Sequence, residues 1–244
     1  MKPILIVQHE HDVGPGRFEH YLIDNGFPHE FVRVFANDSM PSSAERYSGL
    51  CALGGSMSAN DELPWIDSEI ALMRSADQLG VPIIGHCLGG QLLAKTFGAP
   101  VTRSSLKEIG WGRVDVDNEE LARHWVGAIT GTYLFQWHGD TFAIPVGGRR
   151  FLTSRFCTNQ AFVIERGGFA HLGMQFHVEM TAELVHEWAT DPLGRAEIER
   201  AFAGQDGAGV QLPDEMLRNL DERAQRMAVI ADRLYDNWTK CLRR

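Results

Sequence analysis

The most constraining feature of this sequence is a sharp strand-to-helix corner that carries one cysteine. Residues 81–85 form a short apolar run rich in Val and Ile, which is typical of a buried strand. Cys87 follows, flanked by His86 and Leu88, and two glycines then lead into an apolar helical stretch closed by Gly98. Small neighbours let the backbone turn sharply and hold a reactive side chain at the edge of a sheet. The pattern predicts an α/β fold with a cysteine nucleophile elbow.

A helix that begins directly behind Cys87 has two chemical consequences. The positive end of the helix dipole favours the thiolate, which is the nucleophilic form of cysteine. Backbone N–H groups of the first turn, notably that of Leu88, point to where a carbonyl oxygen would gain charge. The alternative is a buried structural cysteine beside glycines that are needed for packing.

A candidate base for this thiol lies downstream. His177 and Glu179 follow a strand-like stretch over residues 170–176. In extended backbone, residues two apart point to the same side. A carboxylate beside an imidazole fixes its tautomer and supports its positive charge, while the imidazole exchanges protons with the thiol and the leaving group. An exposed His and Glu at a strand end is the alternative.

A pair of glycines marks a third element of the site. Gly54 and Gly55 follow an apolar run over residues 50–53. Adjacent glycines after a parallel strand present backbone N–H groups at the carboxyl edge of the sheet, where the sites of α/β proteins lie. A plain turn would explain the same two residues.

The order of apolar runs predicts a three-layer α/β domain with a central, mostly parallel sheet and helices on both faces. A helix is expected from Pro64 to a glycine cap at Gly80. Strands in the later half of the chain have few helices between them, so some are expected to be antiparallel at one edge. The expected strands are 4–7, 31–35, 50–53, 81–85, 112–116, 135–138, 151–154, 161–165 and 170–176, followed by a helix over 181–189 and a loop over 203–211.

The C-terminal segment has the clearest helical periodicity. Apolar residues recur every three or four positions from Leu217 to Trp238, which predicts one amphipathic helix of about seven turns. Its apolar face either packs back on its own domain or binds another subunit, as in a homodimer. We expect residues 1–190 to form the α/β domain and residues 191–244 a C-terminal helical extension.

Composition excludes several classes of protein. The chain has 244 residues, 44% of them hydrophobic, which suits one domain with an appendage. A net charge of -9 disfavours nucleic acid as a partner. Four scattered cysteines indicate neither a disulfide scaffold nor a structural zinc site, and no apolar run is long enough to span a membrane. We expect a cytoplasmic protein without a metal site, although His9 and His11 follow the first strand.

Together these segments resemble the class I glutamine amidotransferase domain. Residues 85–91 (Gly-His-Cys-Leu-Gly-Gly-Gln) are similar to its G-x-C-x-G-x-Q motif, and residues 177–179 to its HxE motif. Gly54 and Gly55 match its oxyanion-loop glycines. Residues 137–140 (Trp-His-Gly-Asp) resemble the segment that contacts the amino-acid end of glutamine, most closely in the GMP synthetase glutaminase. The resemblance covers about residues 1–190, in the family's order.

The resemblance implies a nucleophile, a base and an orienting carboxylate at Cys87, His177 and Glu179. No organic cofactor or metal is required for this chemistry. His86 is a departure, because the family usually has an aliphatic residue there. The other implied residues are the oxyanion-hole donors Gly55 and Leu88, and the substrate-binding residues Gly54, Gln91, His138, Gly139 and Asp140.

The implied reaction is hydrolysis of the glutamine γ-amide, through a thioester, to glutamate and ammonia. The sequence has neither a Gly-x-x-x-x-Gly-Lys loop nor a Ser-Gly-Gly-x-Asp-Ser loop for ATP. A separate synthetase subunit would therefore activate the ammonia acceptor. Alternatively, the chain is a free-standing γ-glutamyl peptidase that acts on γ-glutamyl conjugates. A non-catalytic binding module of the same fold is a third possibility, which the intact motifs disfavour.

Overall fold

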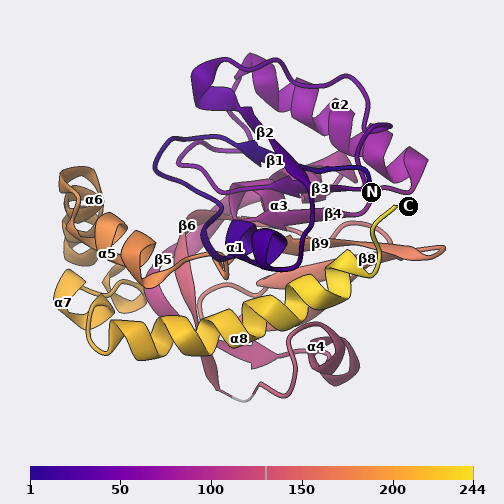
Figure 1. Cartoon of the computed structure of the whole chain (residues 1–244). Coiled ribbons are helices and arrows are strands. Elements are labelled where there is room, and N and C mark those ends of the chain that lie inside the picture. Colours follow the sequence, from indigo (N-terminus) through magenta and orange to yellow (C-terminus); the bar gives the residue numbers. More distant parts are fainter. Residues whose placement is uncertain (130, 244) are drawn as a thin grey trace.

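The computed structural model describes residues 1–129 and 131–243, whose strands form one sheet in the order β2-β1-β3-β4-β9-β8-β7-β5-β6 (Figure 1). The neighbours from β2 to β9 pair in parallel, and those from β9 to β6 pair antiparallel. The strands are β1 (Ile4–Gln8), β2 (His29–Arg33), β3 (Gly49–Ala52), β4 (Ile83–His86), β5 (Val101–Val116), β6 (Thr132–Phe142), β7 (Gly148–Ser154), β8 (Ala161–Arg166) and β9 (Phe169–Met174).

Alternating side chains of the parallel strands build two core layers. Ile4 and Ile6 pack in a cluster with residues of α1 (Gly16–Asp24) and α8 (Leu220–Thr239). Leu5 and Val7 pack in the other cluster, with α2 (Pro64–Leu79) and α3 (Leu88–Thr96). In Figure 1, α8 crosses in front of the sheet with α1 beside it. The predicted three-layer α/β fold is confirmed.

Sequence signals at both ends of α2 correctly predicted its bounds. Pro64 stands in its first turn, and Gly80 ends it in the left-handed region, with φ 70°. The predicted helix over 181–189 is α5 (Ala182–Thr190), whose N-terminus is capped by the Thr181 hydroxyl. Periodicity did not predict the short or more polar helices, which are α1, α4 (Glu119–Trp125) and α6 (Pro192–Ala203).

Several predicted strand bounds were wrong. The strand expected over 31–35 ends at Arg33, because Val34–Ala36 forms a 3₁₀ turn. The strand expected over 112–116 is only the end of β5, a sixteen-residue strand that pairs with β6 across a register shift. Its first part is rich in polar residues, so apolar alternation does not mark it.

The predicted single C-terminal helix is interrupted. A short helix, α7 (Pro213–Met216), precedes α8, and Asn219 separates them with φ 53°. The apolar face of α8 is buried within its own chain, with Tyr235 and Trp238 fully covered. Arg17 and Tyr21 of α1 bond to acidic groups of α8. This face is therefore not available to another subunit.

No helix in the described part of the chain is both long and apolar enough to cross a bilayer.

A buried histidine in β9 makes stability depend on pH. His171 Nδ1 accepts from the Ile83 N–H at 3.0 Å, and Nε2 donates to Asp77 at 3.1 Å. Burial lowers the pKa of His171 from 6.5 to about 4. Because the unfolded chain takes up this proton first, the free energy of unfolding falls by about 3 kcal/mol between about pH 6.5 and about pH 4.

Urea unfolding across this pH range tests the assignment. We expect His171→Gln to lower stability near neutral pH and to reduce the pH dependence, since glutamine does not titrate. An unchanged pH dependence in the variant would show that another group is responsible.

Candidate active site

Cys87 lies in strained backbone between β4 and α3. Its φ is 48° and ψ is -106°, a conformation that a non-glycine residue adopts only when its surroundings hold it there. The Cys87 N–H donates to Met174 O at 2.8 Å. A Cβ atom at Gly89 would collide with the backbone of Ala52, so only glycine lets α3 approach β3 this closely. The packing places the thiol at the carboxyl ends of the parallel strands, as an elbow requires.

His177 and Glu179 lie next to this corner, in the segment that follows β9. The His177 N–H donates to Phe135 O at 2.8 Å, and Nδ1 is 2.6 Å from Glu179 Oε1. Burial would lower the pKa of His177, but the charges of Glu179 and Cys87 and a hydrogen bond with Cys87 raise it to about 10. Burial would raise the pKa of Glu179, yet the His86 and His177 rings lower it. The site therefore favours an imidazolium beside a carboxylate.

Two further groups contact the Cys87 sulfur. Gln175 Nε2 is 3.5 Å from Sγ, and Sγ is 3.7 Å from Trp137 O. Gln175 was not among the site residues expected from the sequence. The signal was available, since Gln175 stands two residues before His177 and extended residues two apart share a face.

Gly54 comes close to His177, and Gly55 comes close to Leu88. A Cβ atom at Gly54 would lie 2.8 Å from His177 Cε1, and one at Gly55 would lie 2.9 Å from a Leu88 methyl group. The glycine pair thus lets the loop after β3 pack against the imidazole. Leu88 is the first residue of α3, so its N–H has no partner within the helix.

The second oxygen of Glu179 faces a buried polar group. His86 Nε2 is 3.8 Å from Glu179 Oε2 and 3.4 Å from the Tyr235 hydroxyl. Burial lowers the pKa of His86. Glu179 opposes this shift, and His86 is a packed neighbour of the nucleophile that lies between Tyr235 of α8 and the carboxylate.

A pocket of about 370 Å³ is lined by His177 and Gly55. Helices α5 and α6 form its outer wall. The Trp188 ring stands edge-on to His177 with centroids 5.3 Å apart, and Glu197 bonds Lys107 at 2.5 Å and Trp137 Nε1 at 3.0 Å. Neither Trp188 nor Glu197 was expected from the sequence, because their place in the pocket wall depends on how α5 and α6 fold back.

Four of the five predicted substrate-binding residues meet at this pocket, and Gly54 does not line it. Gln91, His138, Gly139 and Asp140 all line it. Gln91 Nε2 lies 3.3 Å from Gln175 Oε1, and Asp140 accepts from the Ser58 hydroxyl at 2.8 Å. The His138 ring is occupied elsewhere, with Nδ1 3.1 Å from Asp140 O and Nε2 3.2 Å from Glu108.

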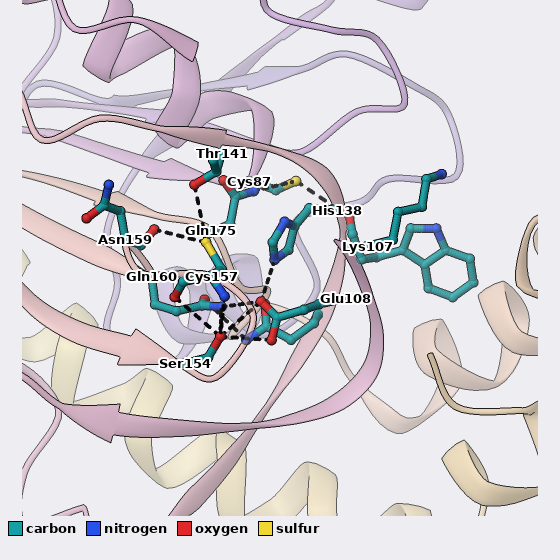
Figure 2. Close-up of polar contacts among 12 residues, drawn as sticks. Cys87, Lys107, Glu108, His138, Thr141, Ser154, Cys157, Asn159, Gln160 and Gln175 are labelled. Atoms are coloured by element: carbon teal, nitrogen blue, oxygen red, sulfur yellow. Dashed lines mark hydrogen bonds and ion pairs between the residues drawn. The ribbon is translucent and has the colours of Figure 1, made fainter. Parts of the chain in front are cut away.

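A cluster of buried polar side chains contacts the segment over residues 137–140 through His138. Figure 2 shows His138 pointing toward Glu108, which also receives hydrogen bonds from Ser154 and Gln160. Ligating atoms of Glu108, His138 and Cys157 lie within 4.8 Å of one another. Because hydroxyl and amide donors face the Glu108 carboxylate, its charge is compensated by hydrogen bonds. The cluster supports the 137–140 segment from beneath.

Comparisons with known proteins agree on one family. The sequence profile described as glutamine amidotransferase class-I matches residues 17–188. The chain is 31% identical over 186 residues to the glutamine amidotransferase-like protein YfeJ of Salmonella typhimurium, which covers 73% of this chain and 76% of that protein. It is 32% identical over 134 residues to the glutamine-hydrolysing GMP synthase of Listeria monocytogenes, covering 54% of this chain. The match spans only 24% of that synthase.

Solved structures share the whole fold. A glutamine amidotransferase from Methylobacillus flagellatus has a TM-score of 0.91 and 40% identity, covering 100% of this chain and 96% of that one. A glutamine amidotransferase from Thermotoga maritima has a TM-score of 0.83 and 26% identity, covering 97% of each chain.

Proposed function

Because this chain belongs to the class I glutamine amidotransferase family, we propose that it hydrolyses the γ-amide of glutamine through a thioester on Cys87. The observation that carries the proposal is the grouping of Cys87, His177 and Glu179, in which His177 interacts with both neighbours, contacts Glu179 at 2.6 Å and lines a pocket. The ammonia released would pass to an acceptor that another protein activates.

In the proposed reaction, the Cys87 thiolate attacks the amide carbon and the carbonyl oxygen becomes an oxyanion. The N–H groups of Gly55 and Leu88 would stabilise that charge. The His177 imidazolium then donates its proton to the departing ammonia, and Glu179 holds the ring in position. Water activated by the neutral His177 hydrolyses the thioester, which yields glutamate and restores the thiol.

The amino-acid end of glutamine would lie against the other side of the pocket. Asp140 is suited to the substrate ammonium group, and Gln91 to a polar atom near the thiol. Gly54 and Gly139 would contribute backbone and space. The buried ring of His138 suits a supporting role for this segment, rather than direct contact.

We propose that residues 191–244 are an extension of the family's core over residues 1–190. The family match ends at residue 188, which supports this division. The four cysteines are all free thiols, which fits a cytoplasmic location. A synthetase subunit or a second copy of the chain would have to bind away from the buried face of α8.

A γ-glutamyl peptidase is the second candidate, and the pocket wall favours it. Leu193, Gly194 and Glu197 of α6 line the pocket. Its volume of about 370 Å³ leaves room for a leaving amine larger than ammonia. In that case the chain would act alone on γ-glutamyl conjugates.

Substrate preference separates these two functions. We expect the isolated chain to hydrolyse glutamine, with kcat/KM above that for glutathione or a γ-glutamyl anilide. Extract from the native source should raise glutamine turnover by about tenfold, because partners commonly complete the closure of such sites. Cys87→Ala with the same extract corrects for other glutaminases.

Efficient turnover of the bulky conjugates, unchanged by extract, would favour the peptidase and contradict the amidotransferase proposal. Turnover of none of the three substrates would contradict both.

A further inference from the structure

His9 lies behind the Gly54–Gly55 loop, at the end of β1, with its ring wholly buried. Its Nδ1 is 3.0 Å from Gly54 O and its Nε2 is 2.8 Å from Glu69 Oε2. Gly54 O can only accept, so Nδ1 carries a proton, and donation from Nε2 to the Glu69 carboxylate makes the ring an imidazolium. Burial opposes this charge, but Glu69 outweighs burial and raises the pKa of His9. A buried ion pair therefore holds the Gly54 carbonyl.

Glu10 holds the other side of the same loop. Its carboxylate accepts from the Ser56 N–H at 2.8 Å and from the Ser56 hydroxyl at 2.6 Å. Gln8 Nε2 in turn donates to Glu10 O at 3.0 Å. Three consecutive residues at the end of β1 thus support the loop on both sides of Gly55.

The peptide that joins Gly54 to Gly55 is oriented by these contacts. In a planar trans peptide the C=O and the N–H point in opposite directions. With Gly54 O directed at His9, the Gly55 N–H must point away from His9. Across the described residues, this N–H donates to no backbone acceptor. Two consecutive glycines allow the peptide between them to flip at little cost. Contacts from outside the loop therefore decide how this peptide is oriented.

We propose that His9 is a positioning residue that locks the Gly54–Gly55 peptide with its N–H directed at the substrate oxyanion, so that the oxyanion hole is formed in the isolated chain. Glu10 reinforces the lock through Ser56. This inference rests on the proposed function. It implies that any stimulation by a partner acts elsewhere in the site, such as on closure by α5 and α6.

Two substitutions of His9 test whether it orients the Gly54–Gly55 peptide or only fills space in the core. An asparagine amide can occupy the position of Nδ1 and keep the bond to Gly54 O. A glutamine amide can occupy the position of Nε2 and keep only the contact with Glu69. We expect His9→Gln to lower kcat by about 100-fold, as loss of one oxyanion donor does, with KM changed less than about threefold. His9→Asn should retain about tenfold more activity than His9→Gln.

The matched control is His171→Gln, which replaces another buried histidine, one that bonds Ile83 and Asp77 away from the pocket. It should lower the melting temperature and leave kcat unchanged. Alkylation of Cys87 by iodoacetamide is the second readout. It needs no oxyanion hole, so both His9 variants should react at the wild-type rate.

Wild-type kcat in a folded His9→Gln chain, or equal losses in the Asn and Gln variants, would overturn the proposal. If the His9 variants do not fold, Glu10→Ala replaces them, with an expected loss of kcat of about tenfold and unchanged KM. Unchanged kcat there would also overturn it. If the wild-type chain does not hydrolyse glutamine, the proposed function is refuted. If the wild-type chain is active and the variants keep its kcat, only the inference about His9 is refuted.

Discussion

Replacing Cys87 with alanine is expected to lower glutamine hydrolysis by about 10⁴-fold or more while the chain stays folded, because the described residues that line the pocket offer no other thiol to form the thioester. Only small residual catalysis from the oxyanion hole would remain. Steady-state kinetics of the purified variant measures the loss. Circular dichroism and the melting temperature serve as the control for folding.

Labelling by a diazo-ketone analogue of glutamine identifies the nucleophile directly. Burial raises the pKa of Cys51 well above its usual value, that of Cys157 to about 11, and that of Cys241 as well. These three thiols therefore stay protonated, and we expect the label only on Cys87. Peptide mapping by mass spectrometry reads the site. Label on another cysteine, or substantial turnover by Cys87→Ala, is incompatible with the assignment.

Replacing His177 with alanine should be the second most damaging change. Without the imidazole, neither the thiol nor the departing ammonia exchanges its proton, so we expect a loss in kcat of about 10⁴-fold. Glu179→Ala should cost about 10²-fold, because the ring remains and only its orientation and charge support are lost. Glu179→Gln should lie between Glu179→Ala and wild type, since an amide oxygen can still accept from Nδ1.

Exposed residues of α5 offer matched controls for these two variants. His186 and Glu183 lie on the surface of the same segment, and their alanine variants should have wild-type rates. Equal losses in His177→Ala and Glu179→Ala would assign the carboxylate a larger part in proton transfer. Near-normal rates in both would remove the triad from the mechanism.

Much of the candidate site was predictable from sequence because its parts are short and local. Each of its motifs spans only a few residues. These motifs are the glycine-flanked Cys87, the histidine and glutamate two residues apart, and the Gly54–Gly55 pair. The same holds for α2, where Pro64 and Gly80 mark both ends. These signals reflect backbone conformations that neighbouring residues themselves permit or forbid.

Contacts between distant segments were not predictable in the same way. Gln175 shares a face with His177 by simple alternation, but its contact with Cys87 requires β9 to pair with β4. From the sequence alone, His9 suggested only a metal ligand, and no further ligands of suitable spacing accompanied it. Its partners are Gly54 and Glu69, which are 45 and 60 residues away.

The sequence by itself determined the two-faced parallel sheet, the elbow at Cys87 and the apolar stripe of α8, because alternation and helical period depend only on neighbouring residues. The tertiary structure alone decided where that stripe packs, which helices enclose the pocket and what holds the Gly54–Gly55 peptide. An apolar stripe specifies that a face must leave water, but not which surface will cover it. The hydrophobic effect is non-directional, so that choice depends on the shape and hydrogen bonding of the whole fold.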